Sequence, residues 1–252
     1  MKNLERIYPG MTDRITYEEH TSRYIFARKF VIGKKILDMA CGSGYGSKIL
    51  FDGGAAEVYG CDISEDAIEY AKKNYSNESI KFQVMDASKI KFPDNSFDCV
   101  ISFETIEHVL DFKNTVKGFH RILKNDGIII ISTPNKELTS KGKEKPPNPF
   151  HVKEFTKDEF LDLMSEYFTD VELFSQMLKT EIDIKKKIVR NIISAIISLD
   201  VLEFHKRFKK ASVYGSMSDY IDNRSRDYAP MLYQSSHKPF IFIAKGKKRY
   251  LS

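Results

Sequence analysis

Short runs of β-branched and other apolar residues alternate with helix-like patterns from residue 34 to about residue 176. Apolar runs bounded by turn residues are typical of strands inside a sheet, whereas apolar residues spaced three and four apart indicate helices. We predict strands over residues 36–40, 57–61, 80–85, 97–102, 127–133, 171–175 and 240–244. Strands that alternate with helices predict a parallel, doubly wound α/β sheet with right-handed crossovers.

Capping residues mark where several helices begin. Ser64, with two acidic residues directly after it, has the sequence of a helix N-cap. Residues 156–159 read Thr-Lys-Asp-Glu, a capping box that predicts a helix to about residue 167. Residues 112–123 carry apolar side chains at helical spacing, and the Asn-Asp-Gly sequence at residues 125–127 predicts the end of that helix.

The alternation stops after the sixth predicted strand. The next one comes about 60 residues later, which is long for a connection in a compact domain, so we expect a mostly helical insertion over residues 177–238. Residues 188–199 have a broad apolar helical face, and lysines flank it within residues 185–210. Three interpretations stay open: a lid over an acceptor site, a homodimer contact, or a peripheral membrane contact. The predicted organisation is an N-terminal cap helix over residues 1–33 and an α/β domain over residues 34–252.

Composition and charge narrow the class of protein. The chain has 252 residues, of which 42% are hydrophobic and 30% charged, as in soluble globular proteins. The net charge of +5 is unevenly spread, because residues 34–133 carry 12 basic and 15 acidic residues and the later part of the chain is basic. This distribution favours an anionic ligand near the C-terminal part and argues against a nucleic-acid binder that is basic throughout.

The cysteines and the beginning of the chain indicate a compartment. Cys41, Cys61 and Cys99 are too few for a disulfide framework, and each lies among apolar residues where a small buried side chain is expected. The first residues lack the apolar segment of a secretory signal, and the longest apolar stretches are shorter than a membrane span. We therefore expect a protein of the reducing cytoplasm.

Acidic residues end three adjacent predicted strands, where open α/β sheets bind their ligands. Asp38 precedes a glycine-rich turn at residues 41–46 and suits a ligand with an ammonium group near that turn. Asp62 ends the second strand, where a carboxylate can accept both hydroxyls of a ribose, and Asp86 ends the third, where it can receive an exocyclic amine. An NAD site is disfavoured, because Ser47 stands where the third glycine of its motif is expected.

Four motifs in this order resemble the class I S-adenosylmethionine-dependent methyltransferases. They are L-D-M-A-C-G-S-G-Y-G from Leu37, V-Y-G-C-D-I-S from Val58, V-M-D-A from Val84, and S-F-D-C-V-I-S-F-E-T-I-E-H-V from Ser96. The resemblance covers roughly residues 23–176 and the final strand. It implies S-adenosylmethionine as the cofactor and a Rossmann-like sheet of seven strands, with the last strand antiparallel beside the fifth. The residues that it implies for cofactor binding are Asp38, Ala40, Gly42, Ser43, Gly44, Tyr45, Asp62, Ile63, Asp86, Ala87 and Phe103.

Candidate chemistry follows the fourth strand. Glu104, Glu107 and His108 have the spacing of one helical face, and His151 follows in a proline-rich loop. His108 or His151 could act as a general base, with Glu104 beside them. The same four side chains could instead hold a divalent metal, an arrangement similar to that of metal-dependent RNA 2′-O-methyltransferases and of ubiquinone-pathway O-methyltransferases. A purely structural contribution is the third interpretation.

The residues around these motifs indicate a type of acceptor. The sequence Ser-Phe-Glu-Thr at residues 102–105 replaces the Asn/Asp-Pro-Pro-Tyr motif of amino-methyltransferases of DNA and protein. Residues 5–10 and 19–24 resemble a group of small-molecule and glycan methyltransferases that often occur with surface-polysaccharide enzymes. We therefore expect O-methylation of a small or glycan-type acceptor that is anionic, phosphorylated or nucleotide-linked. A metal-dependent RNA 2′-O-methyltransferase is the alternative within enzymes, although nucleic acid is the less expected partner, and a non-catalytic scaffold that binds the cofactor and docks to a membrane or partner is the alternative outside them.

Overall fold

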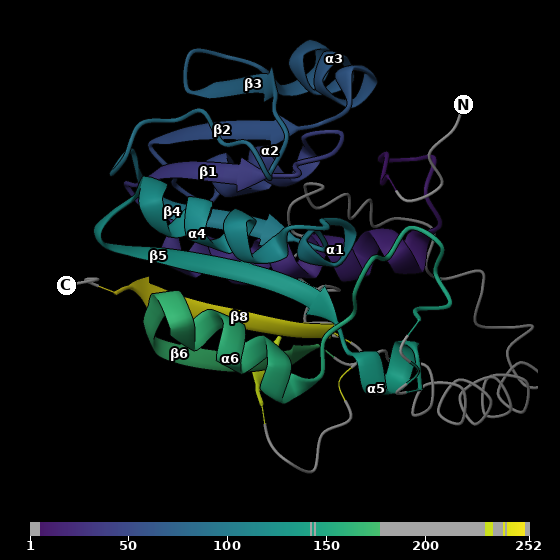
Figure 1. The fold of residues 1–252 in the computed structure, drawn as a ribbon. Helices are drawn as coiled ribbons and strands as arrows, with labels where there is room; N and C mark the ends of the chain where they lie inside the picture. Colours follow the sequence, from purple (N-terminus) through teal and green to yellow (C-terminus); the bar gives the residue numbers. More distant parts are fainter. Residues whose placement is uncertain are drawn as a thin grey trace, which may run out of the picture.

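The fold is built on one mixed sheet (Figure 1). The computed structural model describes residues 6–141, 143, 145–176, 230–233, 239 and 241–249 of the chain. The described strands lie in the order β3-β2-β1-β4-β5-β8-β6-β7. Their bounds are β1 Lys35–Met39, β2 Glu57–Asp62, β3 Ile80–Val84, β4 Phe97–Phe103, β5 Leu123–Pro134, β6 Phe168–Gln176, β7 Met231–Leu232 and β8 Ile241–Lys248.

The direction of the strands agrees with the prediction. Strands β3, β2, β1, β4 and β5 pair in parallel. Strand β8 lies between β5 and β6 and runs antiparallel to both, with Ile131 opposite Ala244. The doubly wound sheet with an antiparallel last strand is thus confirmed. The two-residue strand β7 pairs with β6 and was not predicted.

Helices cover both faces of the sheet (Figure 1). They are α1 Arg14–Ala27, α2 Tyr45–Asp52, α3 Glu65–Tyr75, α4 Phe112–Ile122, α5 Lys136–Thr139 and α6 Lys157–Tyr167, with short 3₁₀ helices η1 Arg28–Phe30 and η2 Ile106–His108. Side chains of α1, α2 and α3 belong to one apolar cluster, and those of α4 and α6 to another. The isoleucine run in β5 supplies both clusters, because Ile128 and Ile130 face the first while Ile129 and Ile131 face the second.

The predicted caps are present. The Ser64 hydroxyl accepts the backbone N–H of Ala67 at 3.3 Å. Thr156 and Glu159 form the reciprocal capping box at the start of α6. These bonds satisfy N–H groups that a helix leaves unpaired in its first turn.

Some predicted boundaries are wrong. Helix α4 ends at Ile122, and β5 begins at once with the buried Leu123, so no helix reaches the Asn-Asp-Gly sequence at residues 125–127. Leu123 is buried and pairs with Phe97 of β4, so it belongs to the strand and the helix ends before it. Strand β6 likewise starts at Phe168, directly after α6, rather than at residue 171. Most of the predicted insertion, including the apolar segment at residues 188–199, lies outside the described residues.

All three cysteines are buried and free, as predicted. Within the described part of the chain, no helix has both the length and the apolar character needed to cross a membrane.

Candidate active site

A cavity of about 1050 Å³ opens at the carboxyl ends of β1, β2, β3 and β4. Its wall comes from the turn after β1, the segment before α1, one side of α1, η2 and the loop at residues 150–151. Eight of the residues predicted to bind the cofactor line it: Ala40, Gly42, Tyr45, Asp62, Ile63, Asp86, Ala87 and Phe103. Glu104, His108 and His151 line it as well. Asp38, Ser43 and Gly44 are not part of this lining.

The glycine-rich turn takes a backbone path that side chains would obstruct. Gly44 is the N-cap of α2 with φ of +84°, and a Cβ there would lie 2.6 Å from the Cβ of Ala71. A Cβ on Gly46 would overlap the ring of Tyr24 at 2.0 Å. These glycines let the first turn of α2 pack tightly against α1 and α3.

Asp62 is the most heavily bonded carboxylate of the cavity wall. One oxygen accepts the backbone N–H of Gly42 at 3.0 Å, and the other accepts the N–H of Ser64 at 2.9 Å. Arg6 also donates to Asp62, at 3.3 Å. Asp62 therefore joins β2, the glycine-rich turn and the N-terminal segment at one point.

Asp38 is buried behind the turn. Its carboxylate accepts the hydroxyls of Ser47 at 2.6 Å and Tyr24 at 3.2 Å. Burial raises the pKa of Asp38 to about 7, although the two hydrogen bonds lower it in part. These two bonds connect Asp38 to α1 and α2, and its contact with an ammonium group stays a prediction.

This buried carboxyl makes stability depend on pH. The pKa of Asp38 is about 7 in the folded protein and about 3.9 in an unfolded chain, so the folded state holds an extra proton between these values. The free energy of unfolding should therefore fall as the pH rises from about 4 to 8, by up to about 4 kcal/mol from this group. Denaturation of the wild type and of Asp38→Asn across this range should show the wild type losing stability relative to the variant. Parallel profiles would contradict the raised pKa.

Asp86 ends the third strand in a local turn. Its Oδ1 accepts both the backbone N–H and the hydroxyl of Ser88, each at 2.8 Å. The N–H of Ser88 is the main cause of the lowered pKa of Asp86, so the carboxylate is ionised at neutral pH.

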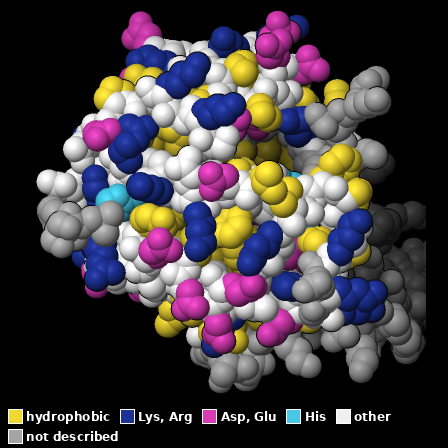
Figure 2. All heavy atoms as spheres, viewed as in Figure 1, with side chains coloured by type: hydrophobic (Ala, Val, Ile, Leu, Met, Phe, Trp, Pro, Cys, Tyr) yellow, Lys and Arg dark blue, Asp and Glu magenta, His cyan; other side chains and the backbone are white. Residues whose placement is uncertain are grey.

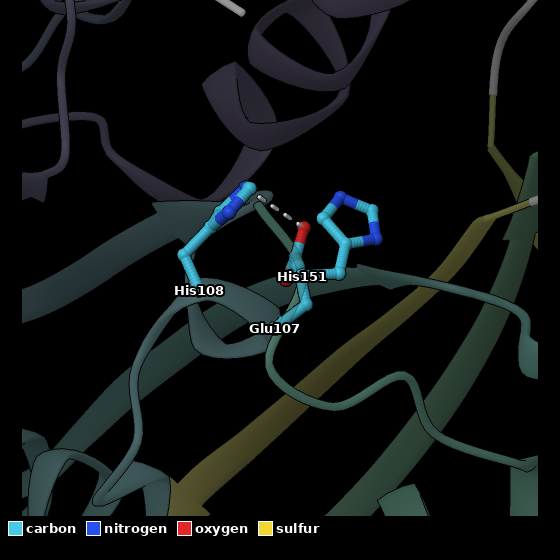
Figure 3. Close-up of side chains that lie close together, drawn as sticks. All are labelled: Glu107, His108 and His151. Atoms are coloured by element: carbon cyan, nitrogen blue, oxygen red, sulfur yellow. Dashed lines mark ion pairs between the residues drawn. The ribbon is translucent and has the colours of Figure 1, made fainter. Parts of the chain in front are cut away.

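The structure gathers three of the four residues predicted to carry the chemistry. Glu107, His108 and His151 offer ligand atoms within 4.8 Å of one another, and the two imidazoles flank the carboxylate of Glu107 (Figure 3). Glu104 does not share a helical face with them, because η2 is only three residues long and Glu104 precedes it with φ of +51°. Its carboxylate instead accepts the hydroxyl of Ser132 at 2.6 Å.

Glu107 lies fully buried on the floor of the cavity. Its Oε2 accepts the hydroxyl of Thr133 at 3.2 Å, whereas its Oε1 has no hydrogen-bond donor among the described residues and lies 4.0 Å from Nε2 of His108. Burial raises the pKa of Glu107 well above its usual range, and the nearby charge of Glu104 adds to this.

The two histidines have different surroundings. Nδ1 of His108 lies 3.0 Å from the carbonyl oxygen of Phe150, which places the proton on Nδ1 when the ring is neutral. Nδ1 of His151 lies 2.7 Å from the carboxylate of Glu154, and its Nε2 lies 3.0 Å from the side-chain amide of Asn148. Both ring nitrogens of His151 thus hold the loop in shape.

Glu154 anchors that loop. Burial alone would raise the pKa of Glu154, but hydrogen bonds from Ser140, Thr139 and His151 lower it. The carbonyl oxygen of Glu107 accepts the N–H of Val152 at 2.7 Å, so the loop is also bound directly to η2.

A metal ion fits these side chains only after a rearrangement. Two atoms that bind one zinc ion in tetrahedral geometry lie about 3.4 Å apart, given bonds of about 2.1 Å. The 4.0 Å between Glu107 and His108 is longer, and the amide of Asn148 lies against Nε2 of His151.

Residues of α1 and of the preceding segment complete the wall. Thr16, His20 and Tyr24 line the cavity at intervals of four residues, and Arg6 lines it beside Asp62. The buried Arg23 positions α1, because its guanidinium donates to the side chain of Gln176 at the end of β6. The spacing of residues 16, 20 and 24 indicates that they share one face of a helix, and this signal is visible in the sequence. Nothing local in the sequence points to the Arg6–Asp62 pair.

Comparison with known proteins identifies the family. The family model described as a methyltransferase domain matches residues 37–131. A probable S-adenosylmethionine-dependent methyltransferase of Mycolicibacterium smegmatis is 30% identical over 169 residues, which are 67% of this chain and 65% of that protein. A solved structure from Pyrococcus horikoshii is 31% identical with a TM-score of 0.53, over 65% of this chain and 88% of that one. The chain belongs to the class I S-adenosylmethionine-dependent methyltransferases.

Relatives within this methyltransferase family differ in their acceptors. Phosphoethanolamine N-methyltransferase 1 of Arabidopsis thaliana is 31% identical over 70% of this chain and 38% of its own length. The chain thus spans less than two thirds of the length of these curated relatives. The region that the family model matches, residues 37–131, includes Gly42, Asp62 and Asp86, which line the cavity described above.

Proposed function

We propose that this protein transfers a methyl group from S-adenosylmethionine to a hydroxyl oxygen of a small or glycan-type acceptor in the cytoplasm. His108 would accept the proton of that hydroxyl. The observation that carries this proposal is the position of His108 in the cavity wall, with its ring held through Nδ1 by the carbonyl of Phe150. Such a ring is oriented to take a proton at its other nitrogen.

The cavity suits the cofactor. Asp62 would hold the ribose hydroxyls and Asp86 the adenine amine, with Ile63 and Ala87 beside the adenine ring. Ile63 keeps 64% of its surface exposed, although it is a large apolar residue, and contact with a flat ring would cover it. When bound, S-adenosylmethionine supplies an electrophilic methyl group on a sulfonium centre.

The chain would contribute alignment and proton removal. An in-line displacement at carbon requires the acceptor oxygen to be held on the axis of attack, and positioning of this kind accounts for much of the rate. Phe103, Glu104 and His108 lie together after β4 and would form the floor on which the acceptor rests. The volume of about 1050 Å³ reaches the upper end of the range for small-molecule sites and leaves room for a second small molecule.

We propose an anionic acceptor, such as a phosphorylated or nucleotide-linked sugar used in surface-polysaccharide synthesis. The support is the basic C-terminal part of the sequence, whose lysines at residues 185–187 and 206–210 lie outside the described residues. Among the described residues of the cavity wall, Arg6 is the one arginine or lysine, and it pairs with Asp62.

A nitrogen acceptor is the second candidate. The similarity to phosphoethanolamine N-methyltransferase 1 of Arabidopsis thaliana favours it, since that relative is 31% identical to this chain and the one from Mycolicibacterium smegmatis is 30% identical. An amine acceptor carrying a phosphate would suit the same basic residues.

Labelled S-adenosylmethionine distinguishes these candidates. The protein is incubated with it and with sugar nucleotides, envelope glycans, phosphoethanolamine and RNA in separate reactions. Label in the sugar or glycan fractions, at an ether that resists mild acid and base, is the expected result. Label in phosphoethanolamine alone would show that the acceptor atom is nitrogen rather than oxygen. Label in RNA alone would contradict both the glycan-type and the phosphoethanolamine acceptor.

A further inference from the structure

Besides Ile63, which is proposed to contact the adenine ring, three large apolar side chains of the cavity wall are exposed. Met11 and Leu110 each keep 81% of their surface exposed, and Phe150 keeps 52%. All three also line the cavity, and we call them the apolar rim. Figure 2 shows hydrophobic side chains gathered around a hollow in this face of the molecule. Single exposed apolar residues are common, but three from separate segments around one opening indicate a binding surface.

Hydrogen-bonded turns hold the rim in place. Met11 belongs to a turn whose N–H groups, at Met11 and Thr12, bond the carbonyl of Tyr8. Phe150 donates its N–H to the side chain of Asn148 at 3.0 Å, and its carbonyl bonds His108. Leu110 follows η2 and precedes Asp111, the N-cap of α4. Met11 and Phe150 thus lie in hydrogen-bonded turns, and all three side chains stay exposed although burying them would be favourable.

The floor of the cavity has the opposite character. Glu104, Glu107 and His108 form the polar floor, because Glu107 is buried and the other two are half-buried, whereas the rim side chains are exposed. Leu110 and Phe150 both adjoin His108, one through the chain and the other through its hydrogen bond to the ring. A ligand that contacts both the polar floor and the apolar rim needs a hydroxylated head and an apolar chain.

We infer that the methyl acceptor is amphipathic, with its hydroxylated head at His108 and an alkyl or prenyl chain lying across Met11, Leu110 and Phe150. This inference rests on the proposed methylation of a hydroxyl in this cavity. It specifies the class of acceptor as a lipid-linked or alkylated hydroxyl compound. The apolar chain covers the rim, and the head carries the polar recognition.

Alkyl glucosides test this inference without knowledge of the natural acceptor. Methyl, hexyl and octyl β-glucosides, below their micelle concentrations, are titrated into the protein saturated with S-adenosylhomocysteine. Full burial of one methylene group strengthens binding about fourfold, and a partly open rim should give at least a tenfold gain from methyl to octyl. The triple variant M11S/L110S/F150S should lose this gain. Ile32→Ser is the matched control, because Ile32 is 71% exposed but is not part of the cavity wall.

Each other outcome contradicts the inference. Affinity that does not rise with chain length in the wild type overturns it, and so does an equal rise in the triple variant. If the wild type sediments with phosphatidylcholine vesicles and the triple variant does not, the rim binds a membrane surface instead. Failure of the proposed function is a separate result, since it would show as no methyl transfer to any hydroxyl while binding still depends on chain length.

Discussion

Replacing Asp62 with alanine is expected to weaken the binding of S-adenosylhomocysteine about a hundredfold. A carboxylate offers two acceptor oxygens to the two vicinal hydroxyls of a ribose, and hydrogen bonds to a charged group contribute about 1.5–3 kcal/mol each. A loss of about 3 kcal/mol corresponds to a factor of about a hundred or more in the dissociation constant. Calorimetric titration of the wild type and the variant measures this factor.

Two further variants separate ribose binding from folding. Asp62 also holds the N–H groups of Gly42 and Ser64, so Asp62→Asn, which keeps an acceptor oxygen, should bind more weakly than the wild type but better than the alanine variant. Asp52→Ala is the matched control, because Asp52 pairs only with the exposed Lys48 on α2 among the ion pairs of the described residues. Unchanged affinity in Asp62→Ala, with an unchanged melting temperature, would remove Asp62 from the cofactor site.

Arg6 lies where it could affect the binding of the ribose to Asp62. Its guanidinium lies 3.3 Å from the same carboxylate that would receive the ribose. Asp62 therefore has to serve a cation and two hydroxyls, or Arg6 has to shift. The pair joins residues 56 positions apart, and no local pattern of the sequence predicts such a contact.

The sheet and the part of the cavity wall around β1, β2 and β3 followed from the sequence because their signals are local. The isoleucine run of β5, the glycine-rich turn and the acids at or near the ends of β1, β2 and β3 can each be recognised from neighbouring residues, and the topology then brings the strand ends together. Eight of the eleven predicted cofactor residues consequently lie in the wall. Asp38, Ser43 and Gly44 are the three that are not part of it, and the buried carboxylate of Asp38 accepts the hydroxyls of Tyr24 and Ser47, contacts that no local pattern of the sequence predicts.

The catalytic side was less predictable, because its geometry depends on tertiary contacts. Helical spacing placed Glu104 with Glu107 and His108, but the chain makes a sharp left-handed turn at Glu104 and only one short 3₁₀ turn follows. His151 reaches the group through a loop that Glu154 and the backbone of Glu107 hold in place. The proximity of His108 and His151 was thus predicted correctly, while the reason given for Glu104 was wrong.

Replacing His108 with alanine is expected to lower the rate of methyl transfer by roughly 10²–10⁴-fold, the usual contribution of a general base. The affinity for S-adenosylhomocysteine should stay the same, because Asp62 and Asp86, the residues proposed to hold the ribose and the adenine amine, lie at the ends of β2 and β3, whereas His108 follows β4. Single-turnover measurements with saturating cofactor give the rate, and calorimetry gives the affinity.

Variants of His151 and His120 are compared with the His108 variant. His151→Ala removes the partner of Glu154 and should act mainly through the loop, raising KM more than it lowers kcat. His120→Gln changes a histidine that bonds the carbonyl of Arg249 outside the cavity, and it should leave the rate unchanged. If EDTA abolishes transfer and zinc or manganese restores it, His108 and His151 are metal ligands rather than a base and its support. If the His108 and His151 variants both stay fully active and EDTA has no effect, the group at residues 104–108 and 151 has only a structural role. Proton removal would then be assigned to solvent or to the acceptor itself.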